Sequence, residues 1–131
     1  MYGRKLVVAP KEITVTSADE KFIQKVFAIL ETQLSNADFD LPSFSQEIGI
    51  SQTHLQRKLN ALLGQSASEL IRTFRLKRAA SLLGQGHGNV SEIAFRVGFS
   101  SPNYFTKCFK DYFGQTPSEY TLHHSSPTLQ K

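Results

Sequence analysis

The chain has 131 residues, 40% of them hydrophobic, which is enough for one compact unit or two small ones but not for several independent domains. Its formal net charge of +4 is uneven, because residues 1–50 sum to −2 and residues 51–131 to +6; the basic second part favours an anionic partner. A single cysteine excludes an internal disulfide. No apolar run near the N-terminus is long enough for a signal peptide or a membrane span, so we expect a cytoplasmic protein without membrane contact.

In chain order, residues 1–16 predict an extended lead-in around Pro10. Ser17 and Glu20 fit a capping box, in which each side chain bonds to a backbone N–H of the other residue, and helical spacing of apolar residues follows to about Asn36. Residues 41–63 predict two short helices around a turn at Gly49. Residues 68–83 predict a long connecting helix.

The chain then repeats itself. Residues 48–51 (IGIS) return as 97–100 (VGFS), and residues 64–69 (GQSASE) return as 114–119 (GQTPSE), with one extra residue in the second copy near Ser101. The second pair of helices is therefore expected over about 90–113, after a glycine-rich hinge at 84–88, and residues 121–131 are expected to be a flexible tail. The predicted fold is all-α, with a domain over 17–120 made of two homeodomain-like helix-turn-helix subdomains joined by the long helix.

The second helix of each pair has an outward polar face once its apolar stripe is buried. In the first copy this face carries Thr53, Gln56, Arg57 and Asn60, and the matching positions of the second copy carry Asn103, Thr106, Lys107 and Lys110. Each set holds an amide, a hydroxyl and a cation, the groups that hydrogen-bond base edges. An exposed helix face is polar in most proteins, but the match between two copies favours sequence-specific binding of double-stranded DNA.

Other polar residues suit the DNA backbone. Free N–H groups at a helix N-terminus attract phosphate, and the predicted helix starts carry Ser51, Ser100 and Ser101, which are also ordinary helix caps. The connecting helix adds Arg72, with Arg75, Lys77 and Arg78 near it, although such cations commonly form a solvated face. We also expect backbone contacts from Asn60 and Lys110, at the far end of each polar face.

Catalysis and metal binding find no support in the sequence. The four histidines and Cys108 lack metal-ligand spacing, and Cys108 lies in a helix without an evident base, so we expect no enzyme, no cofactor and no metal. The competing hypothesis is a helical adaptor whose basic surface binds an acidic protein.

Residues 17–120 resemble the AraC-type DNA-binding domain. The similarity is strongest over 93–110 (IAFRVGFSSPNYFTKCFK) and 113–120 (FGQTPSEY), with support from 48–51 and 54–57 (HLQR), whereas Ser45 departs from the alanine usual in the family. This resemblance implies a transcription regulator whose two recognition helices enter successive major-groove segments, with base contacts from Thr53, Gln56, Arg57, Asn103, Thr106 and Lys107.

Residues 8–17 also resemble the junction that precedes this domain in hybrid two-component regulators. This second resemblance implies an output domain whose signal and dimerisation parts lie elsewhere. We therefore expect the isolated domain to be a monomer, the full-length protein to be a dimer, and RNA polymerase to be a further partner.

Overall fold

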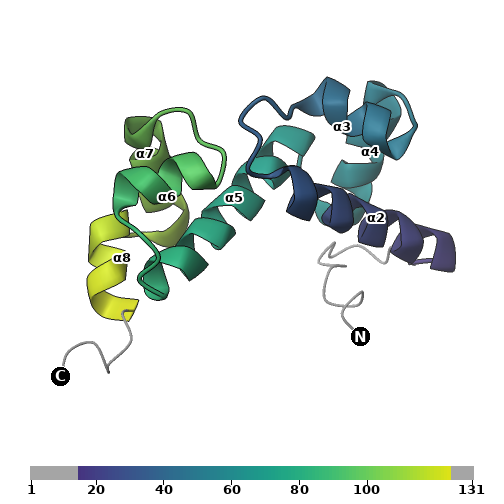
Figure 1. The fold of residues 1–131 in the computed structure, drawn as a ribbon. Coiled ribbons are helices and arrows are strands. Elements are labelled where there is room, and N and C mark those ends of the chain that lie inside the picture. Colours follow the sequence, from purple (N-terminus) through teal and green to yellow (C-terminus); the bar gives the residue numbers. More distant parts are fainter. Residues whose placement is uncertain (1–14, 125–131) are drawn as a thin grey trace. The chain divides into compact units, whose positions relative to one another are not determined.

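The computed structural model describes residues 15–124, which form seven helices and no strand (Figure 1). In chain order they are α2 (Ser17–Gln33), α3 (Leu41–Ile48), α4 (Gln52–Leu63), α5 (Ala67–Gly84), α6 (Val90–Arg96), α7 (Pro102–Phe113) and α8 (Pro117–His124). The predicted all-α class with two helix-turn-helix pairs is confirmed. Within these residues, no helix is both long enough and apolar enough to cross a membrane.

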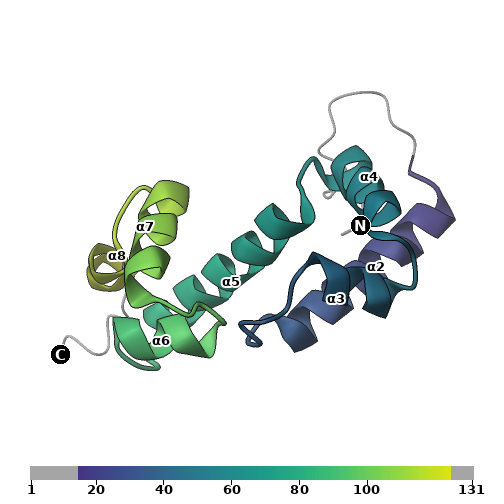
Figure 2. The ribbon, with the colours of Figure 1, turned by 90° about the horizontal axis from the view of Figure 1, so that it is seen from above.

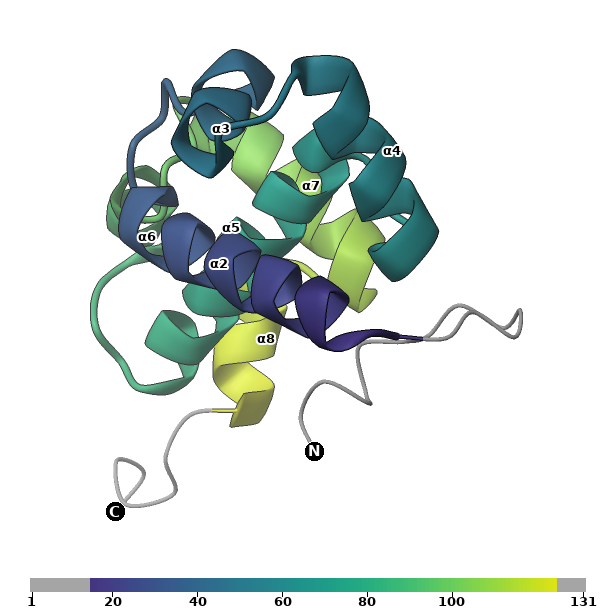
Figure 3. The ribbon, with the colours of Figure 1, turned by 90° about the vertical axis from the view of Figure 1, so that its right-hand side faces the viewer.

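The helices belong to two compact units. Among the described residues, unit 1 comprises residues 15–33 and Phe39–Arg72, and unit 2 comprises Leu34–Asp38 and residues 73–124. In unit 1, α3 and α4 lie on the same side of α2 (Figures 1 and 3). In unit 2, α6, α7 and α8 lie beside the second part of α5 (Figure 2).

Each unit buries its own apolar core. Unit 1 buries residues of its three complete helices, among them Val26, Leu30, Phe44, Leu55 and Leu59, each with no exposed surface. Unit 2 is built around aromatic rings, with centroid distances of 5.6 Å from Phe105 to Phe109 and 4.5 Å from Phe109 to Phe113. Leu55 and Leu59, which recur at helical spacing in the sequence, are thus buried on one face of α4, as that spacing predicts.

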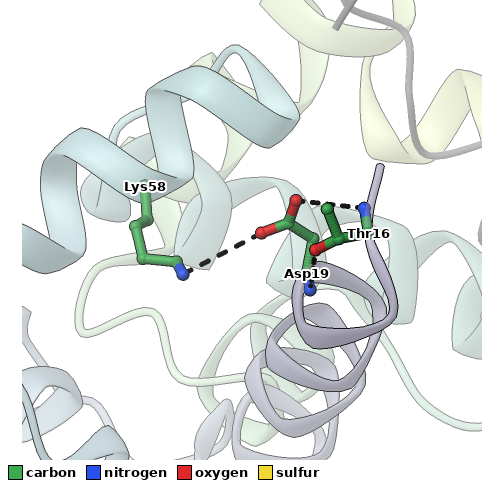
Figure 4. Close-up of polar contacts among 3 residues, drawn as sticks. All are labelled: Thr16, Asp19 and Lys58. Atoms are coloured by element: carbon green, nitrogen blue, oxygen red, sulfur yellow. Dashed lines mark hydrogen bonds and ion pairs between the residues drawn. The ribbon is translucent and has the colours of Figure 1, made fainter. Parts of the chain in front are cut away.

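The start of α2 differs from the sequence prediction by one residue. Its capping box is made by Thr16 and Asp19, not by Ser17 and Glu20, because the Asp19 N–H donates to the Thr16 hydroxyl (3.1 Å) and the Thr16 N–H donates to the Asp19 carboxylate (3.2 Å) (Figure 4). Asp19 is also 4.0 Å from Nζ of Lys58 on α4, a contact that Glu20 does not make. Thr16 is therefore part of the folded domain; residues 1–14 of the expected lead-in lie outside the described residues.

The C-terminal end of the domain also differs from the sequence prediction. Residues 121–124, expected to belong to a flexible tail, complete helix α8 (Pro117–His124). The His124 ring stacks on Tyr120 at 3.9 Å, and Nδ1 of His123 lies 2.7 Å from Oε1 of Gln115. These contacts hold the last turn on the helix, while the remainder of the expected tail lies outside the described residues.

The repeated sequence 64–69 and 114–119 corresponds to a repeated connection between helices. Gly64 and Gly114 end α4 and α7 in the left-handed conformation, at φ of 71° and 82°. Two residues later, Ser66 and Glu69 form a reciprocal capping box that starts α5, and Thr116 and Glu119 form the same box for α8.

Candidate nucleic-acid interface

The second helices of the two helix-turn-helix pairs, α4 and α7, begin in the same way. The Ser51 hydroxyl accepts a hydrogen bond from the His54 N–H (3.1 Å), and the Ser101 hydroxyl accepts one from the Tyr104 N–H (3.2 Å). A hydroxyl that accepts a bond still has its own proton to donate. Ser100 is exposed directly before this cap. The equivalent caps make Ser100 the extra residue of the second copy.

The outward face of α4 agrees in most positions with the sequence prediction. Thr53, Arg57 and Asn60 are exposed, whereas Gln56 is half-buried. Among residues 15–124, Arg57 has no ion-pair partner, so its guanidinium is available to a ligand. Asn60 donates one of its amide hydrogens to the Gln56 backbone carbonyl (3.0 Å) and keeps the other.

The face of α7 repeats this arrangement. Asn103, Lys107 and Lys110 are exposed, and Thr106, which matches Gln56, is half-buried. Nζ of Lys107 lies 3.7 Å from the Asp111 carboxylate, and both side chains are 72% exposed. Pairs this exposed contribute little free energy, so the contact does not prevent Lys107 from binding an anion.

Gln56 has an internal partner that the sequence did not indicate. Its Oε1 atom accepts a hydrogen bond from the backbone N–H of Ala67 at 2.7 Å. Ala67 is the first residue of α5 and is fully buried. The bond therefore joins the outward face of α4 to the first turn of the next helix.

The cations of α5 do not all face solvent. Lys77 and Arg78 are exposed and Arg72 is half-buried. Arg75 donates from Nε to the Leu34 carbonyl (2.9 Å) and from Nη2 to the Asn36 carbonyl (2.7 Å), and burial lowers the pKa of its guanidinium. Of the four cations predicted to reach phosphates, Arg75 is thus engaged within unit 2.

Metal-binding geometry is absent from the described part of the chain, where no three His, Cys, Asp or Glu side chains gather. Hydrogen-bond donors and cations gather instead on each of the two helices, at the start and along the exposed face of α4 in unit 1 and of α7 in unit 2. Each of these faces suits a polyanion that presents hydrogen-bonding edges.

Comparison with known proteins identifies the family. A family model described as a helix-turn-helix domain matches residues 44–122. The chain is 45% identical over 118 residues to histidine kinase P4 of Formosa agariphila, covering 90% of this chain but 9% of that protein. It is 32% identical to the probable transcription factor PqrA of Proteus vulgaris, covering 82% of this chain and 89% of that protein.

Solved structures of similar proteins have the same fold as this chain. The C-terminal domain of AraT, a response regulator of Geobacillus stearothermophilus, superposes with a TM-score of 0.74 at 25% identity, over 87% of this chain and 91% of that one. The DNA-binding domain of AdpA, solved with a target DNA, gives 0.71 at 26% identity, over 78% and 90%. An AraC-type regulator of Chromobacterium violaceum shares the fold, with a TM-score of 0.77 at 23% identity, over 86% and 99%. The chain belongs to the AraC-type helix-turn-helix family of DNA-binding transcription regulators.

Proposed function

We propose that this chain is the output domain of a longer signal-responsive protein and that it reads a specific double-stranded DNA site through α4 and α7. The observation that carries the proposal is the exposure of Arg57 and Lys107 at matching positions of the two recognition helices. Two cations on equivalent faces give each helix a group that binds the O6 and N7 acceptors of guanine.

The neighbouring positions supply the remaining base contacts. Asn103 is exposed, and its amide carries the acceptor and the donor needed for a bidentate contact to adenine. Thr53 and Thr106 offer a hydroxyl for a base acceptor and a methyl group for thymine. Each good base contact is worth about 1–3 kcal/mol of discrimination.

The groups around these faces suit the DNA backbone. Ser51 and Ser101 each keep a hydroxyl proton at a helix N-terminus, where the dipole also favours phosphate, and Ser100 directly precedes Ser101. The remaining phosphate contacts that we expect come from the second amide hydrogen of Asn60 and from the cations Lys110 and Arg72. These contacts contribute affinity for any sequence and make binding depend on salt.

The proposal of a longer protein rests on two comparisons. The chain spans 9% of histidine kinase P4, and the AraT match is the C-terminal domain of a response regulator. We therefore propose the output role of a two-component system in the cytoplasm, where the chromosome is, and no catalytic role for this segment. We also propose that the isolated domain is a monomer, that the full-length protein is a dimer, and that it contacts RNA polymerase at its promoters.

Selection of duplexes from a random pool, followed by titration of variants on the selected site, tests DNA reading. Arg57→Ala and Lys107→Ala should each cost about 1–3 kcal/mol on that site and relax base preference nearby. Arg72→Ala should weaken all duplexes alike and reduce the salt slope by about 1. The matched control is Lys21→Ala, an exposed cation of α2, which should change neither property.

The same selection and titration can also refute the proposed reading of DNA. Recovery of no preferred sequence by the unaltered chain would refute sequence-specific reading. Unchanged affinity and preference in Arg57→Ala would remove that residue from the contact set.

A further inference from the structure

We infer that Gln56 is a positioning residue of the first recognition helix and does not read adenine, so the two helices read DNA differently at their matched position. The inference rests on the proposed DNA contact and assigns which residue supplies specificity within it. It starts from the backbone hydrogen bond that Gln56 accepts.

The start of α5 presents several N–H groups that have no partner within the helix. The Ser66 and Glu69 capping box satisfies two of them, at 2.9 and 3.2 Å. The N–H of Ala67 is not reached by either side chain of the box and is taken by Oε1 of Gln56 at 2.7 Å. Because Ala67 is fully buried, that N–H has no access to water, and leaving it unpaired would be costly.

The second copy of the motif handles the same position in another way. The residue that matches Ala67 is Pro117, the first residue of α8, and proline has no N–H. The residue that matches Gln56 is Thr106. Its side chain is too short to repeat the Gln56 bond, and such a bond is not needed because Pro117 has no N–H. The Thr116 and Glu119 box is otherwise the same as that of Ser66 and Glu69.

The bond limits what Gln56 can recognise. A glutamine reads adenine with both ends of its amide, since the oxygen accepts from N6 and the nitrogen donates to N7. The Gln56 oxygen has a second lone pair, but its bond to the buried Ala67 N–H turns the amide toward α5, so the oxygen and the nitrogen do not both face one adenine edge. The NH₂ group that is left donates to any acceptor without distinguishing adenine. Thr106 keeps its hydroxyl for the base at the matched position of α7.

A thermal double-mutant cycle tests the hydrogen bond without DNA. Gln56→Met keeps the length but loses the acceptor and should lower Tm by about 4–8 °C, as expected for one lost buried bond in a small domain. Gln56→Glu keeps an acceptor near a helix N-terminus and should retain Tm. In an Ala67→Pro chain, Gln56→Met should have no measurable effect, because the N–H is gone. Thr106→Val is the matched control in α7 and should leave Tm unchanged.

Selection from the random duplex pool then tests the reading. Gln56→Met should leave the selected sequence unchanged, whereas Thr106→Val should alter preference at one base pair. Ala67→Pro frees the Gln56 oxygen and should add an adenine preference of about tenfold at the facing base pair, which Gln56→Met then removes.

Two results would overturn the inference. One is a Gln56→Met variant that loses base preference while keeping its Tm. The other is an equal Tm loss from Gln56→Met in the unaltered chain and in the Ala67→Pro chain. If the unaltered chain selects no sequence, the proposed function fails, but the thermal cycle still decides whether Gln56 positions α5.

Discussion

Gly98 offers the sharpest test of how unit 2 is held together. It adopts φ of 100°, and a Cβ at this position would collide with the Leu34 carbonyl oxygen and lie 2.7 Å from Nε of Arg75. The same carbonyl accepts the 2.9 Å hydrogen bond from Arg75. Gly98→Ala must therefore either displace this backbone or break the bond.

The expected cost has two parts. A left-handed conformation costs a non-glycine residue about 1–2 kcal/mol. Loss of a hydrogen bond from a half-buried guanidinium adds about 1.5–3 kcal/mol. The sum, about 2.5–5 kcal/mol, is a large share of the 5–15 kcal/mol that typically separates a folded domain from its unfolded state.

Gly114→Ala is the matched control, because it lies in the same unit at φ of 82° with nothing within 4 Å of the added Cβ. Only the conformational cost applies there. Urea unfolding followed by circular dichroism should show a midpoint for Gly98→Ala well below that of Gly114→Ala, with similar slopes. Equal midpoints would refute the close approach of Gly98 to Leu34.

Three further outcomes follow from the caps and the proposed assembly. Asp19→Ala removes the bond from the Thr16 N–H but keeps the one to the Thr16 hydroxyl, and should cost about 0.5–1.5 kcal/mol of stability, whereas Asp19→Asn keeps both bonds and loses only the weak pair with Lys58. The hydrogen bond from the Thr116 N–H is the main cause that lowers the pKa of Glu119, so the ionised carboxylate stabilises the fold above its ordinary pKa of 4.5. This stabilisation is lost as pH falls through the lower pKa of the folded state. Glu119→Gln should therefore make Tm depend less on pH below 4.5. A coiled coil fused ahead of Lys11 should tighten binding to paired sites by about 10²–10⁴, and a stable dimer of the unfused chain in sedimentation would contradict the proposed monomer.

Helix positions and buried faces were readable from the sequence because they depend on local spacing. Leu55, Leu59 and Leu62 recur at helical intervals and are all buried. Gly49 and Gly64 end their helices in the left-handed conformation that glycine tolerates. Such signals need no knowledge of which segment packs on which.

Structural features that depend on residues far apart in the chain could not be predicted from the sequence. Thr16 with Asp19 and Ser17 with Glu20 both fit a capping box, and the position of Lys58, far along the chain, accompanies the first pairing. The bonds from Arg75 to Leu34 and Asn36 join residues 41 and 39 positions apart. The helix that continues to His124 had an available signal, because Thr116 and Glu119 repeat the pattern of Ser66 and Glu69.

The two copies agree where the backbone makes the same demand and differ where it does not. A helix that starts inside a folded unit must have its first N–H groups bonded or removed. Unit 1 bonds the Ala67 N–H with Gln56, whereas unit 2 removes the donor with Pro117. The first solution commits an outward side chain of the recognition helix to the fold, and the second leaves Thr106 free. If α4 and α7 read DNA as proposed, the residue that begins α5 or α8 governs how much of the preceding helix face remains available to it.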